Sequence, residues 1–204
     1  DFLTGEDALT LFAVTRSNQV GYDQAFFDTE APDIDDDELG VRYDDVGANS
    51  GRDDILKLGI QTDGSQGVQA IETSTAIGGR ATHVTTKRIY GVQWTAGTDL
   101  QFSMDGVKDP NPDIDGAAAT GSLTGSNDIY IGIGTKGNTG STGWDGAIGD
   151  VIAYREPLGT TRLTLVRNYL SAKYDIDLNT SNGAIDVYAG DTGASGDYDR
   201  GVFG

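Results

Sequence analysis

The chain has 204 residues, enough for one large domain with a sizeable core, and 30 of them are glycine. Its formal net charge is −18, from 32 acidic and 14 basic residues. Such a surface repels nucleic-acid phosphates and anionic membranes, and favours Ca²⁺ binding or simply solubility in salty water. The chain has no cysteine, which excludes disulfides, thiolate metal sites and cysteine nucleophiles. No run of about 18 apolar residues is present, so we expect no membrane insertion.

The first half of the chain predicts strands joined by glycine-rich turns. Four segments carry the pattern: 9–16, 24–29, 54–62 and 88–94. The first has apolar side chains on both faces, which is typical of an inner strand. The third alternates, and this directs Leu56, Leu58 and Ile60 toward a core. In the fourth, Trp94 shares a face with Val92, so we expect its indole to be core rather than a sugar-stacking surface.

The second half continues the pattern with a hairpin and two more strands. Residues 100–109 alternate and contain Asp105-Gly106, the pair that a type I′ hairpin turn requires. Residues 128–134 predict one strand with three isoleucines on one face, and 146–155 predict another buried strand. Many short strands at these spacings indicate a sandwich or jelly roll.

One amphipathic helix is predicted near the end, at about 159–174. Thr160 or Thr161 can cap its first turn, and Arg167 and Lys173 complement the dipole at its C-terminal end. Its apolar stripe consists of Leu163, Val166, Leu170 and Tyr174. A stripe of this width must dock on the sandwich, and we expect it to cover a sheet edge or the open end of the core.

The order of these motifs resembles a laminin-G-like domain of the concanavalin A-like lectin/glucanase superfamily, and the bacterial secreted version above all. The hairpin at Asp105-Gly106 is followed by "IGIG" (131–134), then by "GAIGDVIAY" (146–154) and the helix end "YLSAKY" (169–174). Asp150 stands where the family has glutamate, and Asp175 stands where it has glycine. Neither departure affects the expected fold.

The resemblance covers about residues 7–176. It implies an all-β fold: a two-sheet antiparallel jelly-roll sandwich, concanavalin A-like, with one C-terminal amphipathic helix packed on it. We therefore expect residues 1–176 to form the sandwich with its closing helix. Residues 177–204 are rich in glycine and aspartate and are interpreted as a tail or as the lead-in to a further module.

The sequence predicts no catalytic residues. The glucanase branch of the superfamily uses an E-x-D-x-x-E strand, on which two carboxylates can act as nucleophile and acid. The nearest approach is "DIDDDE" (33–38), which lacks the glutamates and is interpreted as a solvated acidic loop. His83, the one histidine, has no evident partner and is interpreted as an ordinary half-exposed side chain. We expect neither an enzyme nor an organic cofactor.

Calcium is the better chemical candidate. The segment "DPNPDIDG" (109–116) offers oxygen ligands at alternate positions, and Ca²⁺ takes six to eight such oxygens. The candidate ligands are Asp109, Asn111, Asp113 and Asp115. The alternative is a polar loop, where Asp, Asn and Pro are common for turn reasons. The acidic segment 43–54 is a weaker candidate.

Aromatic residues could stack on sugars, but nothing in the sequence selects one. Trp144 precedes the strand at 146–155, where the family places a core aromatic, so we expect it to be packed. Tyr22, Tyr43 and Tyr188 have loop-like surroundings.

The resulting prediction is a noncatalytic extracellular module of a larger secreted or cell-surface protein, binding a glycan or another surface ligand in adhesion. Two alternatives stay open. One is a structural, self-associating subunit of a filament, sheath or surface layer. The other is a glycoside hydrolase, which needs a carboxylate pair that the sequence does not reveal.

Overall fold

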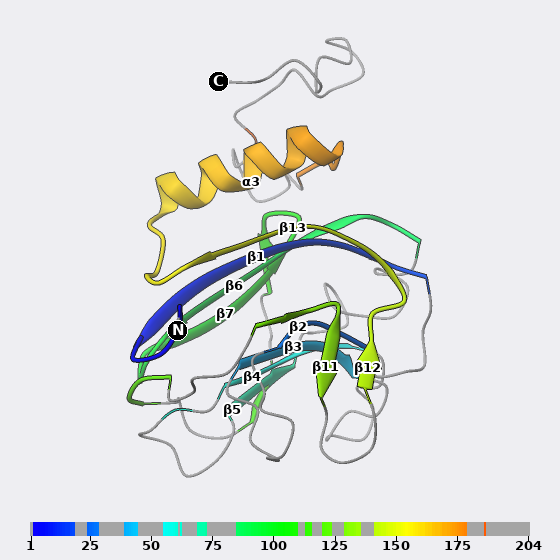
Figure 1. Cartoon of the computed structure of the whole chain (residues 1–204). Coiled ribbons are helices and arrows are strands. Elements are labelled where there is room, and N and C mark those ends of the chain that lie inside the picture. The colour runs from blue at the N-terminus through cyan, green and yellow to red at the C-terminus, as the bar shows by residue number, and fades with distance from the viewer. Residues whose placement is uncertain are drawn as a thin grey trace.

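A computed structural model of the chain describes residues 2–18, 24–28, 39–44, 55–60, 62, 69–72, 85–109, 113–115, 120–123, 129–135, 141–178 and 186. The described part is a β-sandwich of two antiparallel sheets with one helix on its outer side (Figure 1). The predicted fold class is therefore confirmed. No helix among these residues is long and apolar enough to cross a membrane.

The first sheet has the strand order β13-β1-β6-β7-β8. Its strands are β1 (Ala8–Ser17), β6 (Arg88–Thr95), β7 (Asp99–Met104), β8 (Val107–Lys108) and β13 (Gly146–Tyr154). β1 is an inner strand, as predicted, because Leu11 pairs with Val92 on one side and with Ala153 on the other. This position explains why β1 is apolar on both faces.

The second sheet has the order β10-β2-β3-β4-β5-β9. Its strands are β2 (Gln24–Asp28), β3 (Leu39–Asp44), β4 (Ile55–Ile60), β5 (Gln69–Glu72), β9 (Asp113–Asp115) and β10 (Tyr130–Ile131). A small hairpin of β11 (Ile133–Thr135) and β12 (Ser141–Gly143) lies beside it. Ile60 is buried, as predicted.

The main core lies between the two sheets. The predicted inward face of β6 is confirmed, because Tyr90, Val92 and Trp94 are all buried there. Phe26 of β2 stacks on Tyr90 with ring centroids 6.2 Å apart and meets Trp144 edge-on at 5.5 Å. Aromatic contacts from β2 and β6 therefore join the two sheets.

A second core lies on the outer face of the first sheet, beneath α3 (Thr160–Tyr174). Figure 1 shows α3 above the layer of β13, β1, β6 and β7, on the side away from β2–β5. All four residues of the predicted apolar stripe take part in this core: Leu163, Val166, Leu170 and Tyr174. They pack on Phe12 and Val14 of β1. The helix therefore covers a sheet face, and not a sheet edge or an open end as the sequence had suggested.

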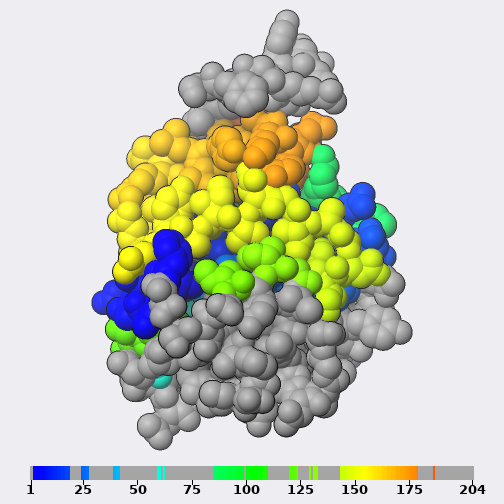
Figure 2. Space-filling view, viewed as in Figure 1, coloured from blue at the N-terminus to red at the C-terminus, as the bar shows by residue number. Residues whose placement is uncertain are grey.

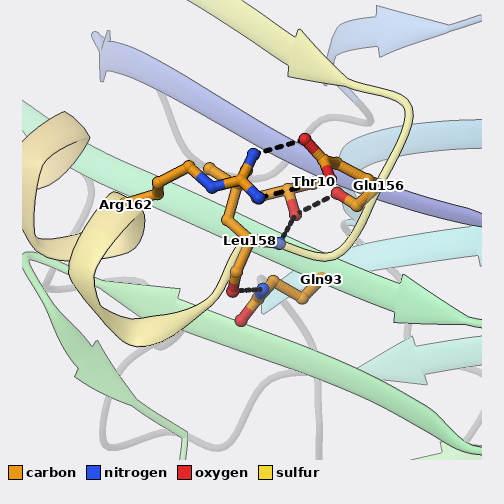
Figure 3. Close-up of polar contacts among 5 residues, drawn as sticks. All are labelled: Thr10, Gln93, Glu156, Leu158 and Arg162. Atoms are coloured by element: carbon orange, nitrogen blue, oxygen red, sulfur yellow. Dashed lines mark hydrogen bonds and ion pairs between the residues drawn. The ribbon is translucent and has the colours of Figure 1, made fainter.

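A hydrogen-bonded loop delivers the chain from β13 to α3 (Figure 3). The Thr10 hydroxyl donates to the Glu156 carbonyl (2.9 Å) and accepts from the Leu158 amide (3.0 Å). The Gln93 side-chain amide donates to the Leu158 carbonyl (3.0 Å), and Arg162 pairs with Glu156. Side chains of β1 and β6 thereby fix where the helix begins.

The hairpin prediction is confirmed in detail. Asp105 and Gly106 connect β7 to β8 with φ angles of 47° and 84°. The Asp105 carboxylate accepts from the Ile89 amide (2.9 Å) and from Arg88 Nη1 (2.7 Å), and its own amide donates to the Ile89 carbonyl. The turn is thus tied to the start of β6.

Other local predictions were wrong. The single strand expected at 128–134 is broken at Gly132 (φ 78°) into β10 and β11, which pair with different strands. β13 is an edge strand of the first sheet and is only partly buried. The helix N-cap is Gly159, with no side-chain cap from Thr160 or Thr161.

Candidate ligand-binding site

The predicted calcium ligands fall in different parts of the sandwich. Asp109 follows β8, is only 1% exposed, and donates its amide to the Phe102 carbonyl (2.8 Å). Asp113 and Asp115 lie on β9, which pairs with β5, so the alternative of a polar loop throughout this segment is wrong. Asn111 lies outside the described residues. The part of the chain that the structure describes contains no cluster of three or more acidic or histidine side chains suited to a metal ion.

Other sequence candidates can be placed only in part. Trp94 is buried in the core, as expected, and Trp144 packs partly buried against it. The Trp144 indole donates to the Arg16 carbonyl (3.3 Å). Tyr43 is in β3 rather than in a loop. His83, Tyr22, Tyr188, residues 33–38 and most of 43–54 lie outside the described residues.

The best-defined candidate surface is where α3 meets β13. We call it the α3–β13 surface and define it by Asp150, Leu165, Tyr169, Lys173 and Tyr174. Leu165 is 61% exposed and Tyr169 is 51% exposed, although both are large apolar or aromatic side chains. The helix and the yellow surface of β13 meet directly in the space-filling view (Figure 2). The exposed ring of Tyr169 lies beside the edge strand that carries Asp150.

Helix spacing places these side chains together. Leu165, Tyr169 and Lys173 are four residues apart, and residues at that spacing lie on one side of a helix. This row is not the one that packs on β1, which contains Leu163 and Leu170. Tyr174 is positioned by Gly149, where a Cβ atom would lie 2.7 Å from the tyrosine Cζ and Oη atoms. The absence of a side chain at Gly149 lets the Tyr174 ring lie directly on β13.

Lys173 organises the polar groups of this surface. Its ammonium group donates to Asp150 Oδ2 (2.7 Å) and to the Tyr169 hydroxyl (3.2 Å). The same nitrogen lies 5.5 Å from the ring centroids of both Tyr169 and Tyr174, within the range of cation–π attraction. The hydrogen bond to Asp150 is the largest reason why the pKa of Lys173 is raised. Burial raises the pKa of Tyr174.

This arrangement suits a sugar better than it suits catalysis. The Tyr169 ring offers an apolar face with a hydroxyl at its edge, and Lys173 and Asp150 offer a donor and an acceptor beside it. Sequence reasoning had assigned Lys173 to the helix dipole and Tyr174 to the apolar stripe, and had not selected Tyr169 as a surface residue. The sequence signal that could have identified Tyr169 is the four-residue repeat of Leu165, Tyr169 and Lys173, which runs along the helix beside the apolar stripe.

No protein-family model matches this chain, and no curated protein matches it in sequence. Among solved structures, the chain is similar to the CBM40 of the Ruminococcus gnavus IT-sialidase bound to α2,3-sialyllactose, with a TM-score of 0.58 and 12% identity. That match covers 80% of this chain and 84% of the other. The same module bound to α2,6-sialyllactose gives a TM-score of 0.59.

The NanB sialidase from Streptococcus pneumoniae also matches, with a TM-score of 0.59 and 8% identity. The match covers 78% of this chain but only 24% of the sialidase. At these identities the similarity shows a shared β-sandwich fold. It does not assign residues.

Proposed function

We propose that this chain is a noncatalytic glycan-binding module of the laminin-G-like, concanavalin A-like kind, acting in adhesion within a larger secreted or cell-surface protein. The observation that carries the proposal is the similarity over 80% of the chain to a CBM40 whose structures hold sialyllactose. The match also covers 84% of that module's chain.

The α3–β13 surface supplies the contacts for this function. Tyr169 is the stacking ring, and Lys173 and Asp150 are the hydrogen-bonding groups beside it. Their mutual bonds hold them in place before a ligand arrives, which lowers the entropy lost on binding. The absence of an E-x-D-x-x-E strand from the sequence supports a binding role over hydrolysis. An acidic, cysteine-free chain of this fold is consistent with an extracellular location.

A glycan screen followed by calorimetry tests the proposal. We expect saturable binding of at least one oligosaccharide and a loss of about tenfold in affinity for Tyr169→Ala, since a stacked aromatic contributes about 1–1.5 kcal/mol. Phe2→Ala is a matched control, because Phe2 is also an exposed aromatic, at 45%, but lies outside this surface. Equal losses in both variants, or no binding by the wild-type chain, would contradict the proposal.

One observation favours the alternative of self-association. β10 ends the strand order of the second sheet, and Ile129 and Ile131 beside and within it are 44% and 47% exposed. An apolar edge strand is a template for pairing with another copy. Sedimentation of the wild-type chain and of the Ile129→Lys, Ile131→Lys double variant tests this. Assembly that the double variant abolishes would support a structural subunit, and a monomer at all concentrations would exclude this edge as the contact.

A further inference from the structure

Arg167 is a charged side chain directed into the packed side of α3. It follows Val166, which packs on the first sheet, and precedes the buried Asn168, and it is only partly exposed. Its Nη2 atom donates to the Ser103 hydroxyl on β7 at 3.2 Å. The sequence had placed Arg167 at the helix dipole, whereas the structure directs it to the sheet.

Among the described residues, no carboxylate pairs with Arg167. The other two basic residues of α3 do have partners: Arg162 pairs with Glu156, and Lys173 pairs with Asp150. Burial lowers the pKa of Arg167. A partly buried guanidinium with one neutral hydrogen-bond partner costs stability unless an anion completes it.

The sheet beneath Arg167 is shaped to hold this contact. The Ser103 hydroxyl accepts from Arg167 and donates to the Gly91 carbonyl (3.3 Å). A Cβ atom on Gly91 would lie 2.6 Å from that hydroxyl oxygen, so only glycine at position 91 leaves space for the Ser103 hydroxyl. Lys108 pairs with Ser103 across β7 and β8 and is exposed, so a second cation lies on the same face.

The charge of α3 is opposite to that of the chain. Its fifteen residues include three basic and no acidic side chains, in a chain with a net charge of −18. Within the described residues, Arg162 and Lys173 are neutralised by acidic partners, and Arg167 is the basic residue of the helix without one. A guanidinium binds a carboxylate through two parallel hydrogen bonds, which is the geometry that arginine favours.

We propose that Arg167, with Ser103 and Lys108, forms an anion subsite that takes the carboxylate of an acidic sugar. This inference rests on the proposed glycan-binding function and adds a ligand class to it. The subsite lies on the β7–β8 side of α3, whereas the α3–β13 surface lies on its β13 side. The carboxylate of an acidic sugar residue in the glycan would bind the Arg167 guanidinium.

The test compares acidic oligosaccharides with their neutral methyl esters. Calorimetry in 0.15 M NaCl would measure sialyllactose and tri-galacturonate, each beside its ester, on the full chain and on Arg167→Met, Arg167→Lys and Arg162→Met. We expect at least one of the two oligosaccharides to bind the wild-type chain at least about tenfold more tightly as the acid than as the ester. Charge-assisted hydrogen bonds typically provide a difference of this size. Arg167→Met should abolish this preference, Arg167→Lys should keep part of it, and Arg162→Met should keep all of it.

A stability measurement separates a binding role from a structural one. We expect Arg167→Met without ligand to melt at the same temperature as the wild-type chain or higher, because the variant removes an unpaired charge and keeps the packing. A large fall in melting temperature would show that Arg167 is a structural residue and overturn the subsite. Equal binding of acid and ester by the wild-type chain would also overturn it, while leaving glycan binding intact.

A second experiment separates the anion subsite from the glycan-binding proposal. If no oligosaccharide binds, the thermal unfolding of the wild-type chain and of Arg167→Met is measured with and without free glucuronate. A rise in melting temperature confined to the wild-type chain would keep the anion subsite and reject the glycan module. No rise in either chain would reject both.

Discussion

Gly146 lies where the backbone of a neighbouring strand leaves no space for a side chain. A Cβ atom on Gly146 would lie 1.9 Å from the Arg16 carbonyl oxygen, at the point where β13 pairs with the end of β1. We expect Gly146→Ala to lower the free energy of unfolding by about 1–3 kcal/mol, because backbone must move to admit the methyl group. Gly143→Ala is the control, since nothing lies within 4 Å of its Cβ position. Urea unfolding of both variants measures the difference, and equal effects would contradict this reading.

The contribution of Asp105 to the stability of the folded chain depends on pH. Burial raises the pKa of its carboxyl group in the folded state, although the Ile89 amide and Arg88 oppose the shift. Because the folded pKa lies above the unfolded value of 3.8, the folded state binds the proton more tightly. Ionisation of Asp105 therefore lowers stability as pH rises from below 3.8 through the folded pKa.

The variant Asp105→Asn isolates this effect, because asparagine tolerates the same positive φ. We expect the stability of Asp105→Asn relative to the wild-type chain to increase as pH rises from about 3 to 6. Chemical denaturation at each pH measures it. A relative stability that falls over this range would show that the pair with Arg88 outweighs burial.

At the scale of elements, the loop before α3 depends on one buried hydroxyl (Figure 3). Thr10 satisfies both the Glu156 carbonyl and the Leu158 amide. We expect Thr10→Val to cost about 1–3 kcal/mol, because the Leu158 amide is left buried without its acceptor while the side-chain shape is kept. Thr98→Val, which alters an exposed hydroxyl bonded to the Ala96 carbonyl, should cost much less. Thermal unfolding compares them, and a neutral Thr10→Val would mean that water replaces the hydroxyl.

The N-terminus of α3 lacks interactions that usually stabilise a helix. Its N-cap, Gly159, has extended backbone angles (φ −68°, ψ 162°), makes no side-chain cap, and is followed by a first turn without acidic residues. We expect Gly159→Asp to raise the melting temperature by about 1–4 °C, since a cap and the helix dipole both favour the carboxylate. Gly159→Ala provides no cap and should not raise it. A gain of the same size in both variants would point to lost chain entropy instead.

The same elements show how far sequence reasoning reached. Alternation in the sequence located β4, β6 and β7, apolar residues on both faces located β1, and the Asp105-Gly106 pair located the hairpin. The strands β3, β5, β9 and β12 were missed because they are short or charged, and their pairing with neighbours rather than their own pattern makes them strands. The direction of Arg167 could not be read from helix position alone, since its partner, Ser103, lies 64 residues away.

At the scale of the whole molecule, the charge of −18 complicates any test for calcium. Divalent cations of every kind screen a strongly acidic surface, and screening alone stabilises the folded state. A rise in melting temperature with Ca²⁺ is therefore informative only beside Mg²⁺ at the same ionic strength. Of the four calcium ligands predicted from the sequence, Asp113 and Asp115 lie two residues apart on β9, the last strand in the order of the second sheet.

Calcium bound at β9 would raise the stability of the chain. After EDTA treatment, Ca²⁺ at about 100 times its dissociation constant should stabilise the chain by about 2.7 kcal/mol if it binds the native state alone. We expect a rise of several degrees for Ca²⁺, a smaller rise for Mg²⁺ because it requires stricter octahedral geometry, and loss of the difference in the Asp113→Asn, Asp115→Asn double variant. Equal rises for both ions, unchanged in the double variant, would mean that β9 holds no metal and that the acidic strands serve solubility.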